Sequence, residues 1–167
     1  PTQLRPNDAG VEVLAVESSV EMLAAGRMCF STGPVDVLFG VAAVSDYRVA
    51  NPKDSKLKRS DPAAQELKLI ENPDVLATLS SERTAKCTVV GFAAETENEE
   101  ANARKKLDKK GCDLVIANLV GKSHGFGPKD TTVLAVTADD AVPFGPADKR
   151  SVADFVIEQV VRAESKS

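Results

Sequence analysis

The fold of this chain is decided by the stretch VLFGVAAVSD, residues 37–46. Its first eight residues are apolar, and an apolar run of this length bounded by polar residues is typical of a fully buried strand. Asp46 follows the run, and a polar loop then delivers the basic segment KLKRS at residues 56–60. Ligands of open α/β sheets bind beyond the carboxyl ends of the strands. An acid followed by three cations at such an edge therefore predicts a site for a metal–polyphosphate ligand.

Strands and helices are expected to alternate along the rest of the chain. Apolar runs predict further strands at residues 11–16, 66–70, 87–92 and 112–117. Helical patterns and capping residues predict helices at residues 20–28, 73–80, 97–110 and from 148 or 151 to 163. Residues 131–137 and 141–144 flank an Ala-Asp-Asp turn and predict an antiparallel hairpin. The alternation predicts an α/β fold with a mainly parallel sheet, to which the C-terminal hairpin adds an antiparallel edge.

The ends of the predicted helices rest on local capping chemistry. Ser18 or Ser19 is expected to cap the first helix. Asn72 is expected to be the N-cap of the second, with Pro73 at its first helical position and an acid beside the helix dipole. Gly111 suits the residue after the third helix. The last helix is expected to present one apolar face made by Val152, Phe155, Val156 and Val160.

Size and composition restrict the class of protein. A chain of 167 residues is most simply one domain, residues 1–167, with a substantial core. Its net charge of −4 argues against a general nucleic-acid binder, which is usually basic. The apolar runs are of strand length, so neither a signal peptide nor a membrane span is expected, and a cytoplasmic location is predicted. Cys87 and Cys112 lie in apolar runs and are expected to be buried.

Each chemically suggestive residue also has a plain structural interpretation. The standard dinucleotide, P-loop and nucleophile-elbow patterns do not occur in the sequence. The single histidine, His124, lies in a Gly-rich loop and fits a solvated side chain. The basic segment at 56–60 fits a solvated turn, and the cations of residues 104–110 can balance the acidic start of their own helix.

Taken together, five motifs follow one another in the order of a known family. They are AAVSDYR at 42–48, KLKRS at 56–60, ENPD at 71–74, GFAAET at 91–96 and DLVIAN at 113–118. In this order the chain resembles the phosphopantothenoylcysteine synthetases, or phosphopantothenate–cysteine ligases, over residues 11–161. In bacteria this domain is typically the C-terminal half of a bifunctional coenzyme A biosynthesis protein. The other half is a flavin-dependent decarboxylase, so FMN would belong to a fused upstream half and not to this chain.

The resemblance implies a Rossmann-like three-layer fold and a CTP-dependent ligase. The carboxylate of 4′-phosphopantothenate would attack the α-phosphate of CTP with loss of pyrophosphate. The amine of L-cysteine would then take the acyl group from the acyl-cytidylate and release CMP. Mg²⁺ would accompany the triphosphate, and the enzyme would be a homodimer with its site near the subunit interface.

The resemblance also implies roles for individual residues. Lys56 matches the triphosphate lysine, which is the catalytic candidate, and Lys58 and Arg59 would assist it. Asp46 matches an acid that contacts the nucleotide and helps to hold the metal. The remaining nucleotide-binding candidates are Gly40, Val41, Ala42, Ile70, Glu71, Asn72, Pro73, Phe92, Lys106 and Lys110.

The N-terminus departs from the family pattern. The family begins with a strand, a Gly-rich turn and an asparagine that stabilises the acyl-cytidylate, and this N-terminal βαβ portion is expected to be missing here. A truncated ligase domain that does not turn over by itself is therefore predicted. Two alternatives are a nicotinamide-dependent oxidoreductase and a non-catalytic nucleotide-binding module on a similar sheet. The oxidoreductase would need the missing Gly-rich turn and would not need the basic segment at 56–60.

Overall fold

The computed structural model describes residues 10–53, 55, 67–95, 98–119 and 130–165. Five strands form the main sheet in the order β1-β4-β5-β6-β7. They are β1 (Val37–Gly40), β4 (Thr88–Glu95), β5 (Leu114–Leu119), β6 (Thr131–Val136) and β7 (Ala141–Ala147). The first three are parallel, and β6 pairs antiparallel with both of its neighbours, so only β6 runs against the others. The predicted α/β fold with a mainly parallel sheet and a C-terminal hairpin is confirmed.

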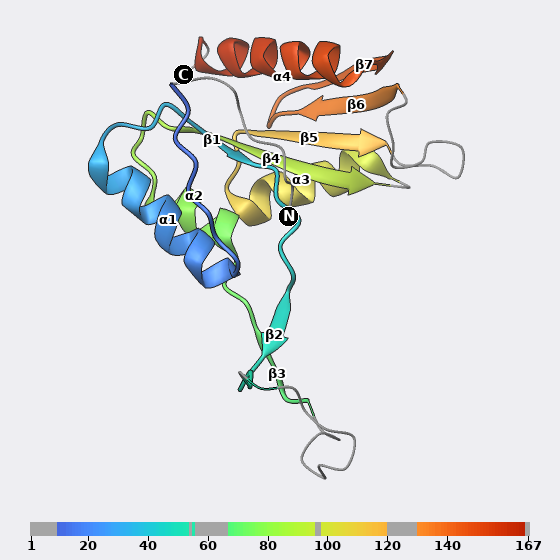
Figure 1. Ribbon diagram of the computed structural model, residues 1–167. Helices are drawn as coiled ribbons and strands as arrows, with labels where there is room; N and C mark the ends of the chain where they lie inside the picture. The colour runs from blue at the N-terminus through green and yellow to red at the C-terminus, as the bar shows by residue number, and fades with distance from the viewer. Residues whose placement is uncertain (1–9, 54, 56–66, 96–97, 120–129, 166–167) are drawn as a thin grey trace.

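Helices cover both faces of this sheet and make three layers (Figure 1). Helices α1 (Ser19–Thr32), α2 (Val75–Glu82) and α3 (Glu99–Lys110) lie on one face, and α4 (Lys149–Glu164) lies on the other. The core beneath α3 buries Val89, Ala93, Ala103, Leu107, Cys112, Val115, Ala117 and Val136. The core beneath α4 buries Val90, Leu114, Ile116, Val133, Ala135, Phe155, Val156 and Val160. Alternate residues of each strand thus point into opposite layers, as the pleat requires.

Local capping chemistry explains where most helices begin and end. Ser18 caps α1 in a capping box with Glu21, and Asp148 caps α4 by accepting a hydrogen bond from the Ser151 amide. Gly111 ends α3 in the left-handed conformation, with φ of 63°. These three ends match the prediction, because each depends on neighbouring residues alone.

The start of α2 differs from the prediction by two residues. Asp74, and not Asn72, is the N-cap, because its side chain accepts the Ala77 amide at 3.2 Å. Pro73 therefore precedes the cap instead of occupying the first helical position. Asn72 is drawn instead toward residues 45–48, whose hydrogen bonds with it are described below.

Two predicted strands are wrong in extent or existence. The run at 37–44 is a strand only as far as Gly40, and residues 41–44 are exposed. Since β1 pairs with β4 alone, it is an edge strand, and Phe39 remains 38% exposed. Residues 11–16 form no strand, and Val11 is 50% exposed. An apolar pattern makes a strand only where a neighbour supplies backbone hydrogen-bond partners.

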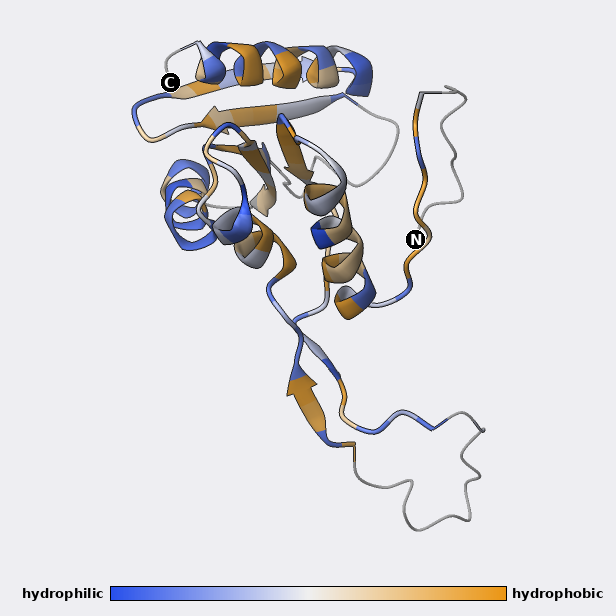
Figure 2. Ribbon diagram, turned by 90° about the vertical axis from the view of Figure 1, so that its left-hand side faces the viewer, coloured by the Kyte–Doolittle hydropathy of each residue, from blue (hydrophilic) through white to orange (hydrophobic). Residues whose placement is uncertain are grey.

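A two-stranded arm projects from the layers in both views (Figure 1, Figure 2). Strands β2 (Tyr47–Val49) and β3 (Leu69–Glu71) pair antiparallel, with Arg48 opposite Ile70. The predicted strand at 66–70 is therefore confirmed with shifted bounds, and β2 was assigned to a loop. The arm leaves Tyr47 and Leu69 each 55% exposed.

Among the described residues, no helix is long and apolar enough to span a membrane.

Candidate functional site

The candidate site lies where β1 ends, beside the middle of β4 and the start of α2. We call it the carboxyl-edge site and define it by Gly40, Asn72, Asp74, Phe92, Lys106 and Lys110. The parallel strands β1 and β4 both point toward this edge, and α2 begins there after the arm returns (Figure 1). The structure thus brings together residues that are up to 70 positions apart in the sequence.

Two lysines of α3 reach different parts of the site. Lys106 and Lys110 are one helical turn apart, so they lie on one face of α3. The ammonium of Lys106 donates to the backbone carbonyl of Phe92 in β4. The ammonium of Lys110 forms an ion pair with the carboxylate of Asp74 at the start of α2. Lys106 is therefore tied to β4, and the side chain of Lys110 reaches from the C-terminal end of α3 to the start of α2.

Asp74 connects the helix start to Lys110. One carboxylate oxygen accepts the Ala77 amide, while the other contacts Lys110. Partial burial raises the pKa of this carboxyl and is the largest single influence. The hydrogen bonds from Lys110 and Ala77, together with the charges of Lys110 and Lys109, outweigh it and leave the pKa of Asp74 below its ordinary value. Asp74 is accordingly a carboxylate at neutral pH and carries a full negative charge.

Asn72 fastens the root of the arm. Its amide nitrogen donates to the Ser45 carbonyl at 2.8 Å, and its backbone N–H donates to the Asp46 carbonyl at 2.8 Å. Arg48 donates to the Asn72 side-chain oxygen at 3.1 Å and to the Glu71 carbonyl at 2.8 Å. These bonds fix the two strands of the arm relative to each other just before α2 begins. In this structure the Asn72 side chain is thus engaged in the fold, and its contact with a nucleotide, which the resemblance implies, stays a prediction.

Glycines allow α2 to approach the sheet closely at this edge. Gly40 and Gly91 are partners in the β1–β4 register. A Cβ on Gly40 would lie 2.7 Å from Leu76 Cδ1, and one on Gly91 would lie 3.5 Å from Leu76 Cδ2. We call this arrangement the glycine slot. It seats Leu76 and thereby sets the height of the start of α2 above the sheet.

The other predicted site residues divide into exposed and undescribed groups. Val41 and Ala42 follow β1 in an exposed segment. Asp46 is also exposed, and Ile70, Glu71 and Pro73 lie at the arm and its junction with α2. Lys56, Lys58, Arg59 and His124 lie outside the described residues. Within the part of the chain that the structure describes, no cluster of three or more His, Cys, Asp or Glu side chains is placed to hold a metal ion.

Sequence reasoning missed two polar contributions. Arg48 was read only as part of a motif, yet it joins the two strands at the root of the arm. The Asp74 carboxylate was assigned to the first helical turn, whereas it is the partner of Lys110. The ENPD motif contained a signal that Asp74 caps α2, because Asp is as good an N-cap as Asn.

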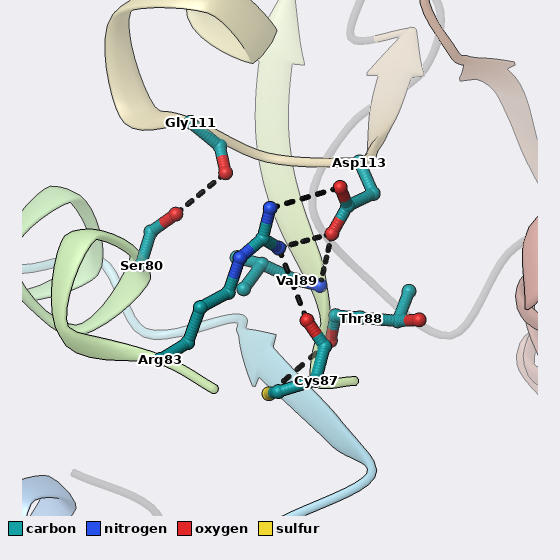
Figure 3. A network of polar contacts seen from close by, with 7 residues as sticks. All are labelled: Ser80, Arg83, Cys87, Thr88, Val89, Gly111 and Asp113. Carbon is teal, nitrogen blue, oxygen red and sulfur yellow. Dashed lines mark hydrogen bonds and ion pairs between the residues drawn. The ribbon is translucent and has the colours of Figure 1, made fainter. Parts of the chain in front are cut away.

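The amino edge of the sheet carries a different polar arrangement (Figure 3). Asp113, just before β5, accepts the Val89 amide at 2.7 Å and forms an ion pair with Arg83. Arg83 also donates to the Cys87 carbonyl at 3.2 Å, and the Ser80 hydroxyl donates to the Gly111 carbonyl at 2.5 Å. We call these residues the amino-edge network.

A cavity of about 840 Å³ lies beside the amino-edge network, with Arg83, Lys86 and Gln159 among its lining residues. It is at the opposite edge from the predicted ligand site. We assign no function to it, because its charged lining is of mixed sign and Arg83 is already paired with Asp113.

Comparison with known proteins decides the family. The family described as the DNA/pantothenate metabolism flavoprotein C-terminal domain matches residues 1–163. The chain belongs to this family. A solved structure of the C-terminal domain of the coenzyme A biosynthesis bifunctional protein CoaBC superposes with a TM-score of 0.76 at 28% identity. It covers 100% of this chain and 72% of that one.

Curated relatives agree with this assignment to the family. The CoaBC protein of Escherichia coli K12 is 32% identical over 160 residues, which is 93% of this chain and 39% of that protein. The CoaBC protein of Vibrio vulnificus YJ016 is 35% identical over 130 residues, 77% of this chain and 32% of that protein. The chain thus spans less than half of these relatives. The resemblance found in the motifs is confirmed, and the chain is a domain of the kind found in coenzyme A biosynthesis proteins.

Proposed function

We propose that this chain is the CTP-binding part of a phosphopantothenate–cysteine ligase of coenzyme A biosynthesis. The observation that carries the proposal is the convergence of Lys106, Lys110 and the start of α2 at the carboxyl edge of a family domain. Cations beside a helix N-terminus suit a polyphosphate, because both attract negative charge. The two alternative functions, an oxidoreductase and a non-catalytic module, have no comparable support.

The proposed reaction has two steps. A carboxylate oxygen of 4′-phosphopantothenate attacks the α-phosphorus of CTP, the bond to the bridging oxygen breaks, and pyrophosphate leaves. The amine of L-cysteine then attacks the acyl carbon, loses a proton as the amide forms, and CMP leaves with the former acyl oxygen. Negative charge grows on the departing pyrophosphate, and fixed cations stabilise that charge.

The described residues have separate roles in this proposal. Lys106 and Lys110 would bind phosphate oxygens, and Phe92 would pack on the nucleotide. The backbone at 40–42 would recognise cytosine by hydrogen bonds, which the exposure of Val41 and Ala42 permits. Lys56, outside the described residues, remains the proposed triphosphate lysine.

Mg²⁺ would neutralise part of the triphosphate charge when bound. The exposed carboxylate of Asp46 fits this ion, because Mg²⁺ is usually held by one or two carboxylates together with substrate phosphates and water. FMN is proposed only for a decarboxylase half fused upstream, as in the bifunctional family members, and takes no part in the chemistry of this domain.

A homodimer in the cytoplasm is also part of the proposal. A two-stranded ribbon is only marginally stable alone, and this arm exposes Tyr47, Leu67 and Leu69 to solvent. A second copy would cover these side chains. Replacing Leu69 by Asp is expected to shift the mass measured by light scattering from dimer to monomer. An unaltered chain that is monomeric at high concentration would contradict the dimer.

Ligand-dependent thermal stability tests the nucleotide assignment. CTP with Mg²⁺ at one hundred times its dissociation constant should stabilise the chain by about 2.7 kcal/mol, whereas ATP and NAD should stabilise it less. Replacing Lys56 by Ala should weaken CTP binding more than CMP binding. Stabilisation by NAD alone would contradict the ligase, and equal loss of CTP and CMP binding would remove Lys56 from the triphosphate.

A further inference from the structure

The Asp74 carboxylate occupies a position that would also suit a ligand anion. It accepts the Ala77 amide in the first turn of α2 and receives the Lys110 ammonium on its other oxygen. A helix N-terminus and a lysine together are the usual surroundings of a bound phosphate. The protein therefore supplies its own anion at this point of the carboxyl-edge site.

The contact is open enough to be exchanged. The side chains of Lys110 and Asp74 are 23% and 40% exposed, so solvent and ligand reach the pair. The Ala77 amide holds the carboxylate of Asp74. Lys110 is the last residue of α3, and its ammonium is carried on a flexible stem. An incoming phosphate can therefore draw the ammonium away while Asp74 stays at the helix cap.

We propose that Asp74 is a specificity-determining residue whose carboxylate competes with ligand phosphate for Lys110. The inference rests on the proposed function and extends it. A ligand gains Lys110 only if its phosphates attract the ammonium more strongly than one carboxylate does. A triphosphate chelated by several groups meets this condition better than a monophosphate, so Asp74 favours CTP over CMP, and Lys110 returns to Asp74 once pyrophosphate has gone.

Replacing Asp74 by Asn separates the charge from the cap. Asn is an equally good N-cap, so α2 keeps its first turn while the competing charge is lost. Binding is measured by titration calorimetry with CTP, CMP and inorganic triphosphate, each with Mg²⁺. CTP and triphosphate should bind about two- to fivefold more tightly, since a partly exposed ion pair must no longer be broken. CMP should gain more than CTP, because a monophosphate is the poorer competitor for Lys110.

Two further variants isolate the contact. Asp148→Asn makes the same change at the N-cap of α4, on the other face of the sheet, and should leave these affinities unchanged. Lys110→Gln should weaken triphosphate binding by about tenfold or more, and in that background Asp74→Asn should give no gain. If Lys110→Gln abolishes the tighter binding caused by Asp74→Asn, the two residues are coupled, as expected of side chains in contact.

Other outcomes would overturn the inference. Weaker binding by Asp74→Asn would show that the carboxylate holds Lys110 for the ligand instead of competing with it. A gain that survives Lys110→Gln would reflect general charge only. If Asp74→Asn binds inorganic triphosphate more tightly but CTP does not bind, the ligase assignment fails, while the competition between Asp74 and phosphate for Lys110 is supported. If neither anion binds the unaltered chain or Asp74→Asn, both proposals fail.

Discussion

The two edges of the sheet use charged side chains in different ways. At the amino edge, Arg83 and Asp113 contact each other and also the backbone of Cys87 and Val89, so each charge has several fixed partners. In the carboxyl-edge site, Lys106 donates to one carbonyl and Lys110 contacts one carboxylate among the residues that the structure describes. An ammonium has three N–H donors, so these lysines retain capacity for another acceptor.

The number of partners distinguishes charges that stabilise the fold from charges that are available to bind a ligand. Removing a charged side chain that has several fixed partners costs free energy, because partly buried groups are left without a hydrogen-bond partner. Charges with one exchangeable partner can move to a ligand at small cost. We therefore expect substitutions at the amino edge to change the free energy of unfolding, and substitutions at the carboxyl edge to change ligand affinity.

The largest effect is expected for Asp113→Ala. The change leaves the Val89 amide without its acceptor and Arg83 without its partner. The free energy of unfolding should fall by about 2–3 kcal/mol, somewhat less than for a fully buried pair. Urea denaturation measures it, and Asp154→Ala, an exposed change on α4, should stay within about 0.5 kcal/mol. Equal losses in the two variants would contradict the structural role of the network.

Lys106→Met should have the next largest effect, and on affinity instead of stability. It removes a charged donor at the carboxyl edge and keeps most of the apolar stem. Affinity for CTP should fall by about tenfold to thirtyfold, or roughly 1.5–2 kcal/mol. Lys105→Met, on the exposed side of the same helix, provides the matched control for calorimetry. A large loss of stability with unchanged affinity would reverse the proposed division between the edges.

Gly111→Ala should lower stability at the amino edge by about 1–2 kcal/mol. The residue has φ of 63°, and a Cβ would lie 2.9 Å from the Ser80 hydroxyl oxygen. Gly33→Ala is the control, because Gly33 has an extended φ of 174° and open space around its Cβ position. Thermal unfolding compares the two variants. A stable Gly111→Ala protein would indicate that the Ser80–Gly111 contact is easily rearranged.

The smallest effect is expected for chemical modification of the cysteines in the native chain, which should leave the free energy of unfolding unchanged. Burial raises the pKa of the Cys112 thiol to about 11, and it also raises the pKa of Cys87. At pH 8 both thiols therefore stay protonated, whereas Cys29 is exposed. A disulfide reagent should modify one cysteine quickly in the native chain and all three after unfolding. Fast modification of Cys112 at pH 8 would show that the amino edge opens readily.

The sequence predicted those features that depend on neighbouring residues. The Ser18 and Asp148 caps, the Gly111 terminus and the hairpin of β6 and β7 all follow from local chemistry. The extent of β1 does not, because burial of residues 37–44 depends on which strands lie beside them. The pairing of Arg83 with Asp113, thirty residues apart, likewise arises only when β4 and β5 lie side by side.

The same distinction holds within the candidate site. Motif order named Phe92, Lys106 and Lys110 as site residues, and in the structure Lys106 contacts Phe92 while Lys110 contacts the start of α2. Their role in nucleotide binding stays a prediction. Motif order could not assign Asp74 to Lys110, since that contact depends on how α2 and α3 pack together. Nor could it show that Asn72 binds the backbone at Ser45 and Asp46, which requires the arm to fold back on itself.

The glycine slot has a consequence for protein engineering. Leu76 fits against Gly40 and Gly91, and a Cβ at position 40 would lie only 2.7 Å from Leu76 Cδ1, so α2 lies this close to the sheet because residue 40 is glycine. A designer who wishes to move the helix start relative to β1 should therefore change the volume of residue 76 and leave both glycines in place. A larger residue there would lift the helix and its cap together, whereas a smaller one would leave room for the helix to settle. The size of the side chain at position 76 thus sets the distance between the start of α2 and the sheet.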